Sequence, residues 1–169
     1  LAGDSVKDII FEIGSGKMAG QRSRSYSMSE LDMNLASGIF AFEAKEFAKA
    51  FKFLSPLAET GNPLAQYRLA VMFQNGLGHV RNEMMALKWM RAAAEQGDAL
   101  AQHGLGFMYM QGECVAKNEK TAAEWFRRAA EQGLAGSQMT LGMLYEQGLG
   151  VEKNETEARK WYEKAQQNS

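Results

Sequence analysis

The C-terminal two-thirds of the chain repeats one unit three times: GNPLAQYRLAVMFQNGLGHVRNEMMALKWMRAAAEQ (61–96), GDALAQHGLGFMYMQGECVAKNEKTAAEWFRRAAEQ (97–132) and GLAGSQMTLGMLYEQGLGVEKNETEARKWYEKAQQNS (133–169). Trp89, Trp125 and Trp161 stand 36 residues apart, and no insertion breaks the register between them. Glycine, asparagine, alanine, leucine and glutamine residues recur at the same step. A fixed period of this length predicts a repeat array in which each unit packs on its neighbours.

Each unit predicts two helices joined by a short loop. In the middle unit, Asp98 is placed to cap a first helix over residues 99–111. Gly112 is placed to end that helix, because glycine readily adopts the left-handed conformation found there. Asn118 then caps a second helix expected over residues 119–132. The unit therefore predicts a helix-turn-helix.

The three copies also provide an internal alignment of the first helix. Nearly invariant positions lie on one side of it and predict its packing face; in the first copy they are Ala65, Gln66, Leu69, Ala70 and Phe73. The opposite side changes from copy to copy, and its spacing of i, i+4 and i+7 forms one line along the helix. We name this line the variable stripe: Tyr67, Val71 and Gln74; His103, Phe107 and Met110; Met139, Met143 and Glu146.

The copies share the pattern A-Q-x-x-L-G-x-x-Y-x-x-G, followed by a short loop and N-x-x-x-A-x-x-W-x-x-x-A-A-x-x-G. This pattern resembles the Sel-one-like repeat (SLR) family. This family is a relative of the tetratricopeptide repeat, and the resemblance covers residues 61 to about 165. It implies a right-handed α-solenoid whose first helices line a concave face, and a scaffold or adaptor role without catalytic residues. Some secreted members are disulfide-rich, whereas Cys114 is the single cysteine here.

Residues 30–60 fit the same register with a shorter loop and predict a degenerate first repeat, whose first helix is capped by Ser29 with Asp32 three residues later. The expected fold is therefore all-α, a right-handed α-α superhelix of about four helix-turn-helix repeats. The expected repeats span approximately residues 30–60, 61–96, 97–132 and 133–169. The preceding residues 1–29 are expected to be a flexible or docking leader. Their apolar patch comprises Val6, Ile9, Ile10, Phe11 and Ile13.

Composition excludes several classes of function. A net charge of −1 gives no basic surface for nucleic acid, and the chain has no run of about 18 apolar residues that would predict a membrane span. The first residue is Leu1, so a targeting signal would lie outside this sequence. The sequence therefore leaves the compartment open between periplasmic or secreted and cytoplasmic.

Few residues suggest chemistry. His79 and Cys114 occupy neighbouring interhelical loops, but two such ligands without a carboxylate make a weak metal site. His103 is interpreted as an unpaired surface histidine on the variable stripe. No combination of nucleophile, base and orienting residue is visible. We therefore expect no enzyme activity, no catalytic residue, no metal and no cofactor.

The favoured function is a protein-interaction scaffold or adaptor that binds a protein or peptide through the variable stripe on the concave face. Methionine-rich surfaces adapt to varied partners, although the next repeat or the leader would bury part of this stripe if it belongs to the core. The alternative is a self-associating structural or assembly protein of a bacterial-type envelope, with a weak homodimer through the C-terminal repeat. An enzyme or metal sensor using His79, Cys114 or His103 is the third alternative. Truncation of Trp161 is expected to cost less stability than truncation of Trp125, because no further repeat follows Trp161 in this sequence.

Overall fold

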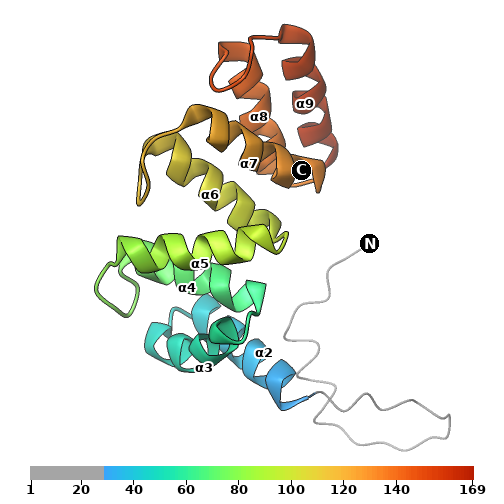
Figure 1. The fold of residues 1–169 in the computed structure, drawn as a ribbon. Helices are drawn as coiled ribbons and strands as arrows, with labels where there is room; N and C mark the ends of the chain where they lie inside the picture. The colour runs from blue at the N-terminus through green and yellow to red at the C-terminus, as the bar shows by residue number, and fades with distance from the viewer. Residues whose placement is uncertain (1–28) are drawn as a thin grey trace, which may run out of the picture.

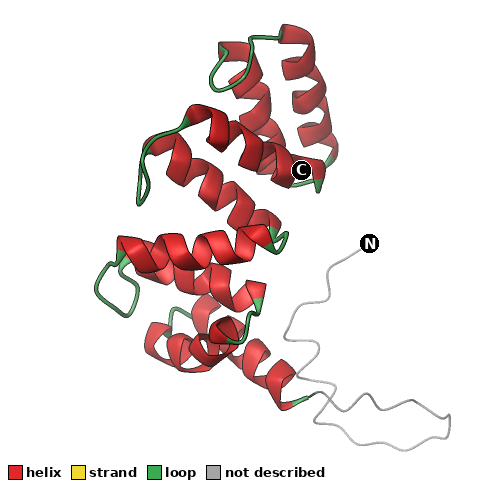
Figure 2. Cartoon of the chain, in the orientation of Figure 1, coloured by secondary structure: helices red, strands yellow, loops and turns green. Residues whose placement is uncertain are grey.

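The computed structural model describes residues 29–169, which form eight helices and no strand (Figures 1 and 2). The predicted leader and its apolar patch lie outside the described residues, apart from Ser29. The helices are α2 (Glu30–Glu43), α3 (Phe47–Glu59), α4 (Pro63–Asn75), α5 (Glu83–Glu95), α6 (Ala99–Gln111), α7 (Glu119–Glu131), α8 (Ala135–Gln147) and α9 (Glu155–Gln167). Within the described residues, no helix has the length and hydropathy needed to cross a membrane.

The helices form four consecutive helix-turn-helix pairs, α2 with α3, α4 with α5, α6 with α7, and α8 with α9. The second helix of each pair also packs on the first helix of the next pair. Figure 1 shows the pairs stacked in chain order, from α2 and α3 at one end to α8 and α9 at the other. The expected all-α superhelix of helix-turn-helix repeats is confirmed.

The helix boundaries follow from local capping residues. At the start of α2, Ser29 Oγ accepts a hydrogen bond from the Asp32 amide at 3.1 Å, and the Asp32 carboxylate accepts one from the Ser29 amide at 3.2 Å. This is the predicted capping box. Asn118 Oδ1 accepts from the Thr121 amide at 3.0 Å at the start of α7, and Gly112 ends α6 with φ 73°. Both predicted boundaries are confirmed.

Replacing the Asn118 cap tests how much this contact stabilises α7. We expect Asn118→Ala to lower the free energy of unfolding by about 1 kcal/mol, because the Thr121 amide loses its acceptor. Asn118→Asp is the control, since its carboxylate keeps an acceptor near the same amide. Urea denaturation measures both variants. Wild-type stability of Asn118→Ala would show that the side chain does not stabilise the helix.

The predicted packing face of the first helices is largely confirmed. Ala65, Gln66, Leu69 and Ala70 are buried in α4, while Phe73 is only half-buried. The tyrosines equivalent to Phe73 are tied by their hydroxyl groups to the preceding pair: Arg91 donates to Tyr109 at 3.1 Å, and Arg127 donates to Tyr145 at 2.6 Å. The packing face also includes positions not predicted from the sequence, namely Met72, Met108 and Leu144, which are buried in α4, α6 and α8.

The recurring glutamines connect successive repeats. Gln102 in α6 is buried; its Nε2 donates to the Ala94 carbonyl of the preceding repeat at 3.2 Å, and its Oε1 accepts from Gln132 at 2.8 Å. The same pair of bonds recurs one repeat earlier and one repeat later. There the partners are Ala58 and Gln96 for Gln66, and Ala130 and Asn168 for Gln138. Each buried amide is therefore satisfied on both its donor and its acceptor side.

The tryptophans differ in burial from the expected order. Trp89 and Trp161 are only 4% and 7% exposed, whereas Trp125 is half-buried. This order of burial runs opposite to the expectation that Trp161 contributes less to stability than Trp125. Trp161 belongs to a core cluster with Phe126 of α7 and Leu144 of α8. Trp161 is therefore buried without a following repeat.

Candidate functional site

The variable stripe runs along α4, α6 and α8, and its exposure differs between these helices. In α4, Tyr67 and Val71 are half-buried and pack against the core. Burial also raises the pKa of the Tyr67 phenol. In α6 and α8, Phe107 is 36% exposed, Met139 48% and Met143 38%. The stripe therefore belongs partly to the core in α4 and forms an apolar surface in α6 and α8.

The exposed part of the stripe spans two neighbouring first helices. His103 Nδ1 in α6 lies 2.7 Å from Ser137 Oγ in α8. A Cβ atom added at Gly136 would lie 3.6 Å from His103 Cε1. Gly136, Met139 and Met143 share one side of α8, because they follow the i, i+3, i+7 spacing. We name His103, Phe107, Met139 and Met143 the α6–α8 patch.

His103 is not the unpaired surface histidine expected from the sequence. It is half-buried, hydrogen-bonded to Ser137, and burial lowers the pKa of its imidazole. The sequence carries a signal for this contact. Ser137 stands where the other two copies have Ala65 and Ala101, and a hydroxyl at a fully buried position requires a hydrogen-bond partner.

The two aromatic rings of the α6–α8 patch pack on each other and on Phe126 beneath them. The Phe107 ring lies edge-to-face 4.9 Å from His103 and 4.9 Å from Phe126 of α7, and His103 lies 5.5 Å from Phe126. Phe126 is fully buried. Gly106 permits its close approach, because a Cβ atom there would lie 2.9 Å from the Phe126 ring. Edge-to-face packing fixes these rings relative to one another, so the patch has a firm apolar floor.

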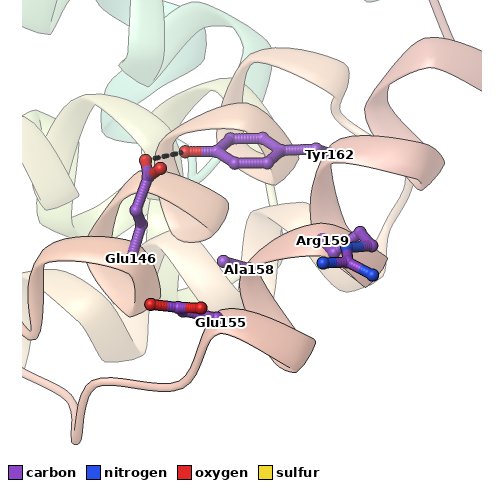
Figure 3. A pocket seen from close by; sticks show the side chains of 5 residues that line it. All are labelled: Glu146, Glu155, Ala158, Arg159 and Tyr162. Atoms are coloured by element: carbon purple, nitrogen blue, oxygen red, sulfur yellow. Dashed lines mark hydrogen bonds between the residues drawn. The ribbon is translucent and has the colours of Figure 1, made fainter.

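The remaining members of the variable stripe lie outside this patch. Gln74 in α4 is half-buried, and Met110 is half-buried against the second core cluster. Glu146 accepts a hydrogen bond from the Tyr162 hydroxyl at 2.8 Å, as Figure 3 shows. Burial, followed by this bond, raises the pKa of Tyr162. Glu146 therefore pairs within its own repeat.

Glu146 and Tyr162 border a shallow cavity of about 240 Å³ between α8 and α9. The lining residues are Glu146, Glu155, Ala158, Arg159 and Tyr162 (Figure 3). Its charged lining differs from the apolar surface of the α6–α8 patch. The two surfaces are therefore chemically distinct, and the patch is the better candidate for an apolar partner.

His79 and Cys114, the two loop residues considered as metal ligands, do not lie in a cluster of ligand side chains within the described part of the chain. The His79 ring lies 4.0 Å from Phe51 and 5.6 Å from Phe73. Cys114 is half-buried with φ 61°, and its pKa is raised by burial and by Glu113. Within residues 29–169, no three His, Cys, Asp or Glu side chains gather as a metal site.

The outer side of α9 differs from that of α7, the helix one repeat earlier. In α7 this side faces the next repeat, with Phe126 buried and Arg127 donating to Tyr145. The corresponding residues of α9 are more polar or of opposite charge: Arg159 for Ala123, Tyr162 for Phe126, Glu163 for Arg127 and Gln166 for Ala130. This side of α9 therefore lacks the residues with which α7 holds the following repeat.

Comparison with known proteins agrees with the repeat pattern. A model of the Sel1 repeat matches residues 63–98, 99–134 and 135–165. Comparison with curated protein sequences finds no match. The crystal structure of a Sel1 repeat protein from Oxalobacter formigenes is similar over 78% of this chain, with 38% identity and a TM-score of 0.75.

Two further solved structures are similar. The first is c5321, described as a protective antigen present in uropathogenic Escherichia coli strains and displaying an SLR fold, with 29% identity over 99% of this chain and a TM-score of 0.77. Helicobacter pylori cysteine rich protein B (hcpB) shares the fold at 22% identity and a TM-score of 0.54. The chain spans 54% of the length of the Oxalobacter protein and 34% of the length of c5321.

Proposed function

Because the chain belongs to the Sel1 repeat family, a family of non-catalytic repeat scaffolds, we propose that it binds a segment of another protein through the first-helix face. The resemblance to this family implies that the first helices line the concave side of the solenoid. The α6–α8 patch lies on those helices and is the contact surface in this proposal. Tyr67, Val71, Gln74, Met110 and Glu146 flank it on the same stripe.

The exposure of Phe107, Met139 and Met143 carries the proposal. Three large apolar side chains are exposed on two neighbouring helices, while Tyr67 and Val71 on α4 pack against the core. Grouped apolar surface of this kind marks contact sites in soluble proteins, because covering it removes apolar area from water. Methionine side chains also adapt their shape to a partner.

Alanine substitutions in the patch test the proposal. A tagged full-length chain is used to capture proteins, which mass spectrometry identifies, and the captured partner is then titrated against variants. We expect Phe107→Ala to weaken binding by about tenfold or more and Met143→Ala to weaken it less, because aromatic residues at the centre of a contact carry most of the energy.

Val80→Ala is the matched control for these substitutions. Val80 is 89% exposed but lies in the loop before α5, away from the patch. The substitution Val80→Ala also removes exposed apolar atoms, and we expect affinity and melting temperature to stay at wild-type values. Equal losses of affinity for Val80→Ala and Phe107→Ala would contradict the proposed site. A large fall in melting temperature for both Phe107→Ala and Met143→Ala would place those residues in the core.

Self-association through the C-terminal repeat remains the alternative role. It has less support, because the outer side of α9 carries Arg159, Glu163 and Gln166 where α7 carries Ala123, Arg127 and Ala130. Light scattering over a range of protein concentrations separates the two roles. A mass that grows with concentration supports self-association, and a constant monomer mass supports the scaffold without self-assembly.

A further inference from the structure

The first helices of the array are nearly free of charge. Across α4, α6 and α8, the charged residues are Arg68 and Glu146. Both are engaged within the protein: Arg68 donates to the Leu64 carbonyl at 3.1 Å, and Glu146 accepts from Tyr162. By contrast, the second helices α5, α7 and α9 each carry several charges of both signs. A charged partner segment would find no opposite charge on the α6–α8 patch.

The patch contains one polar group that points to a specific contact. His103 Nδ1 pairs with Ser137 Oγ, whereas Nε2 has no hydrogen-bond partner among the described residues and is not one of the buried unpaired atoms. Nε2 therefore remains accessible to solvent beside Phe107. A single accessible nitrogen within apolar surface is the arrangement by which binding sites orient a ligand.

The hydrogen bond with Ser137 determines the tautomer of His103. Ser137 is fully buried, and within residues 29–169 its hydroxyl has His103 Nδ1 as its single partner. A buried hydroxyl hydrogen without an acceptor is costly, so Ser137 donates to Nδ1. The imidazole proton then resides on Nε2, which becomes a donor to the exterior. Burial also lowers the pKa of the His103 imidazole, which favours the neutral ring.

Gly136 leaves space beside this donor. It is exposed in α8, and a Cβ atom there would lie 3.9 Å from His103 Nε2. The other two complete repeats have Leu64 and Leu100 at this position. A leucine at position 136 would place its side chain against the imidazole edge, so Gly136 leaves Nε2 of His103 open.

We propose that the α6–α8 patch binds an uncharged apolar peptide segment, and that His103 fixes its position by donating a hydrogen bond from Nε2 to an oxygen of that segment. This inference rests on the proposed function and specifies the partner's chemistry. Phe107, Met139 and Met143 cover the apolar side chains of the segment. A main-chain carbonyl of the segment accepts from His103, which places the polar contact at a single point.

Random-peptide display provides a direct test. The full chain is panned against the library, the enriched peptides are synthesised, and their affinities are measured at low and high salt. We expect the peptides to be uncharged and rich in aliphatic and aromatic residues. Their affinities are expected to change little with salt, because no ion pair contributes to binding.

Variants of the chain then separate the hydrogen bond from the apolar contact. His103→Leu is expected to weaken peptide binding about 3- to 10-fold through the lost hydrogen bond, while His103→Gln keeps a side-chain N–H donor and most of the affinity. Gly136→Leu is expected to weaken binding about as much as His103→Leu by covering Nε2, and Gly136→Ala to weaken it less. Melting temperatures of all variants identify any that fail to fold. Nitrogen-15 NMR of the imidazole provides a measurement without ligand, and is expected to show the Nε2–H tautomer.

The outcomes distinguish this inference from the proposed function. Peptides whose binding is unaffected by Phe107→Ala contradict the proposed function, and an absence of enriched peptides counts against both. Peptides that require Phe107 but are charged, depend on salt, or bind His103→Leu as tightly as wild type overturn the inference alone. An Nδ1–H tautomer overturns it as well.

Two other occupants of the patch would also overturn the inference. If a synthetic peptide of residues 1–28 competes with the enriched peptides, the patch is assigned to the chain's own first segment. If sedimentation shows a dimer that Gly136→Leu dissociates, the patch is assigned to a second copy of the chain.

Discussion

Phe126→Ala is expected to lower the free energy of unfolding by about 3–5 kcal/mol, the usual loss when a large buried aromatic is truncated. Phe126 is fully buried and belongs to the core cluster shared by α7, α8 and α9. Its ring also supports His103 and Phe107 from below. Removing the ring leaves a cavity among α7, α8 and α9. Urea denaturation with circular dichroism measures the loss.

Tyr162→Ala is the matched control for Phe126→Ala. Tyr162 occupies the same repeat position in α9, packs beside Gly142 and is half-buried. We therefore expect its truncation to cost clearly less than that of Phe126, because less apolar area returns to water. Equal losses for the two variants would show that packing of α8 over Phe126 adds little to stability.

Gly150→Ala is expected to destabilise the protein by about 2–4 kcal/mol, the second large effect. Gly150 has φ 67°, and an added Cβ atom would overlap the carbonyl of Glu119 at the start of α7. The overlap involves main-chain atoms, so the loop before α9 would have to move away from α7. The left-handed conformation adds a further cost for any residue with a side chain. The change in urea midpoint measures the sum.

Two variants separate the contributions to the Gly150→Ala effect. Gly133 has φ 92° with no neighbouring atom within 4 Å of an added Cβ, so Gly133→Ala measures backbone strain alone, expected at about 1–2 kcal/mol. Cys114 holds the repeat position of Gly150 with φ 61° and already carries a side chain, so Cys114→Ala is expected to have a small effect. A Gly150→Ala loss no larger than that of Gly133→Ala would show that the loop moves freely.

The helix boundaries could be predicted from the sequence because their causes are local. Asn118 caps the helix that follows it within three residues, and Gly112 ends the preceding helix through its own backbone conformation. The 36-residue step then applies each local prediction to every copy. The packing face was also predictable, since residues that touch the same neighbour in every repeat vary little.

The division of the variable stripe could not be predicted from periodicity. Tyr67 and Phe107 occur on the same stripe, one repeat apart but offset by one turn, yet Tyr67 packs against the core and Phe107 is exposed. Their burial depends on the side chains of neighbouring repeats, which differ between copies. The pairing of His103 with Ser137 likewise joins two helices across a repeat boundary, and periodicity gives no information about such a single contact.

The glutamine bonds have a consequence for how the array opens. Gln102 donates to Ala94 in the repeat before it, and Gln138 donates to Ala130 in the repeat that contains Gln102. If the repeat of residues 97–132 alone opened, Gln138 would lose its acceptor and Ala94 would lose its donor, one broken bond in each neighbour. Local opening of an inner repeat therefore costs the bonds to both neighbouring repeats in addition to the contacts within that repeat. Such coupling between nearest neighbours favours cooperative opening of adjacent repeats.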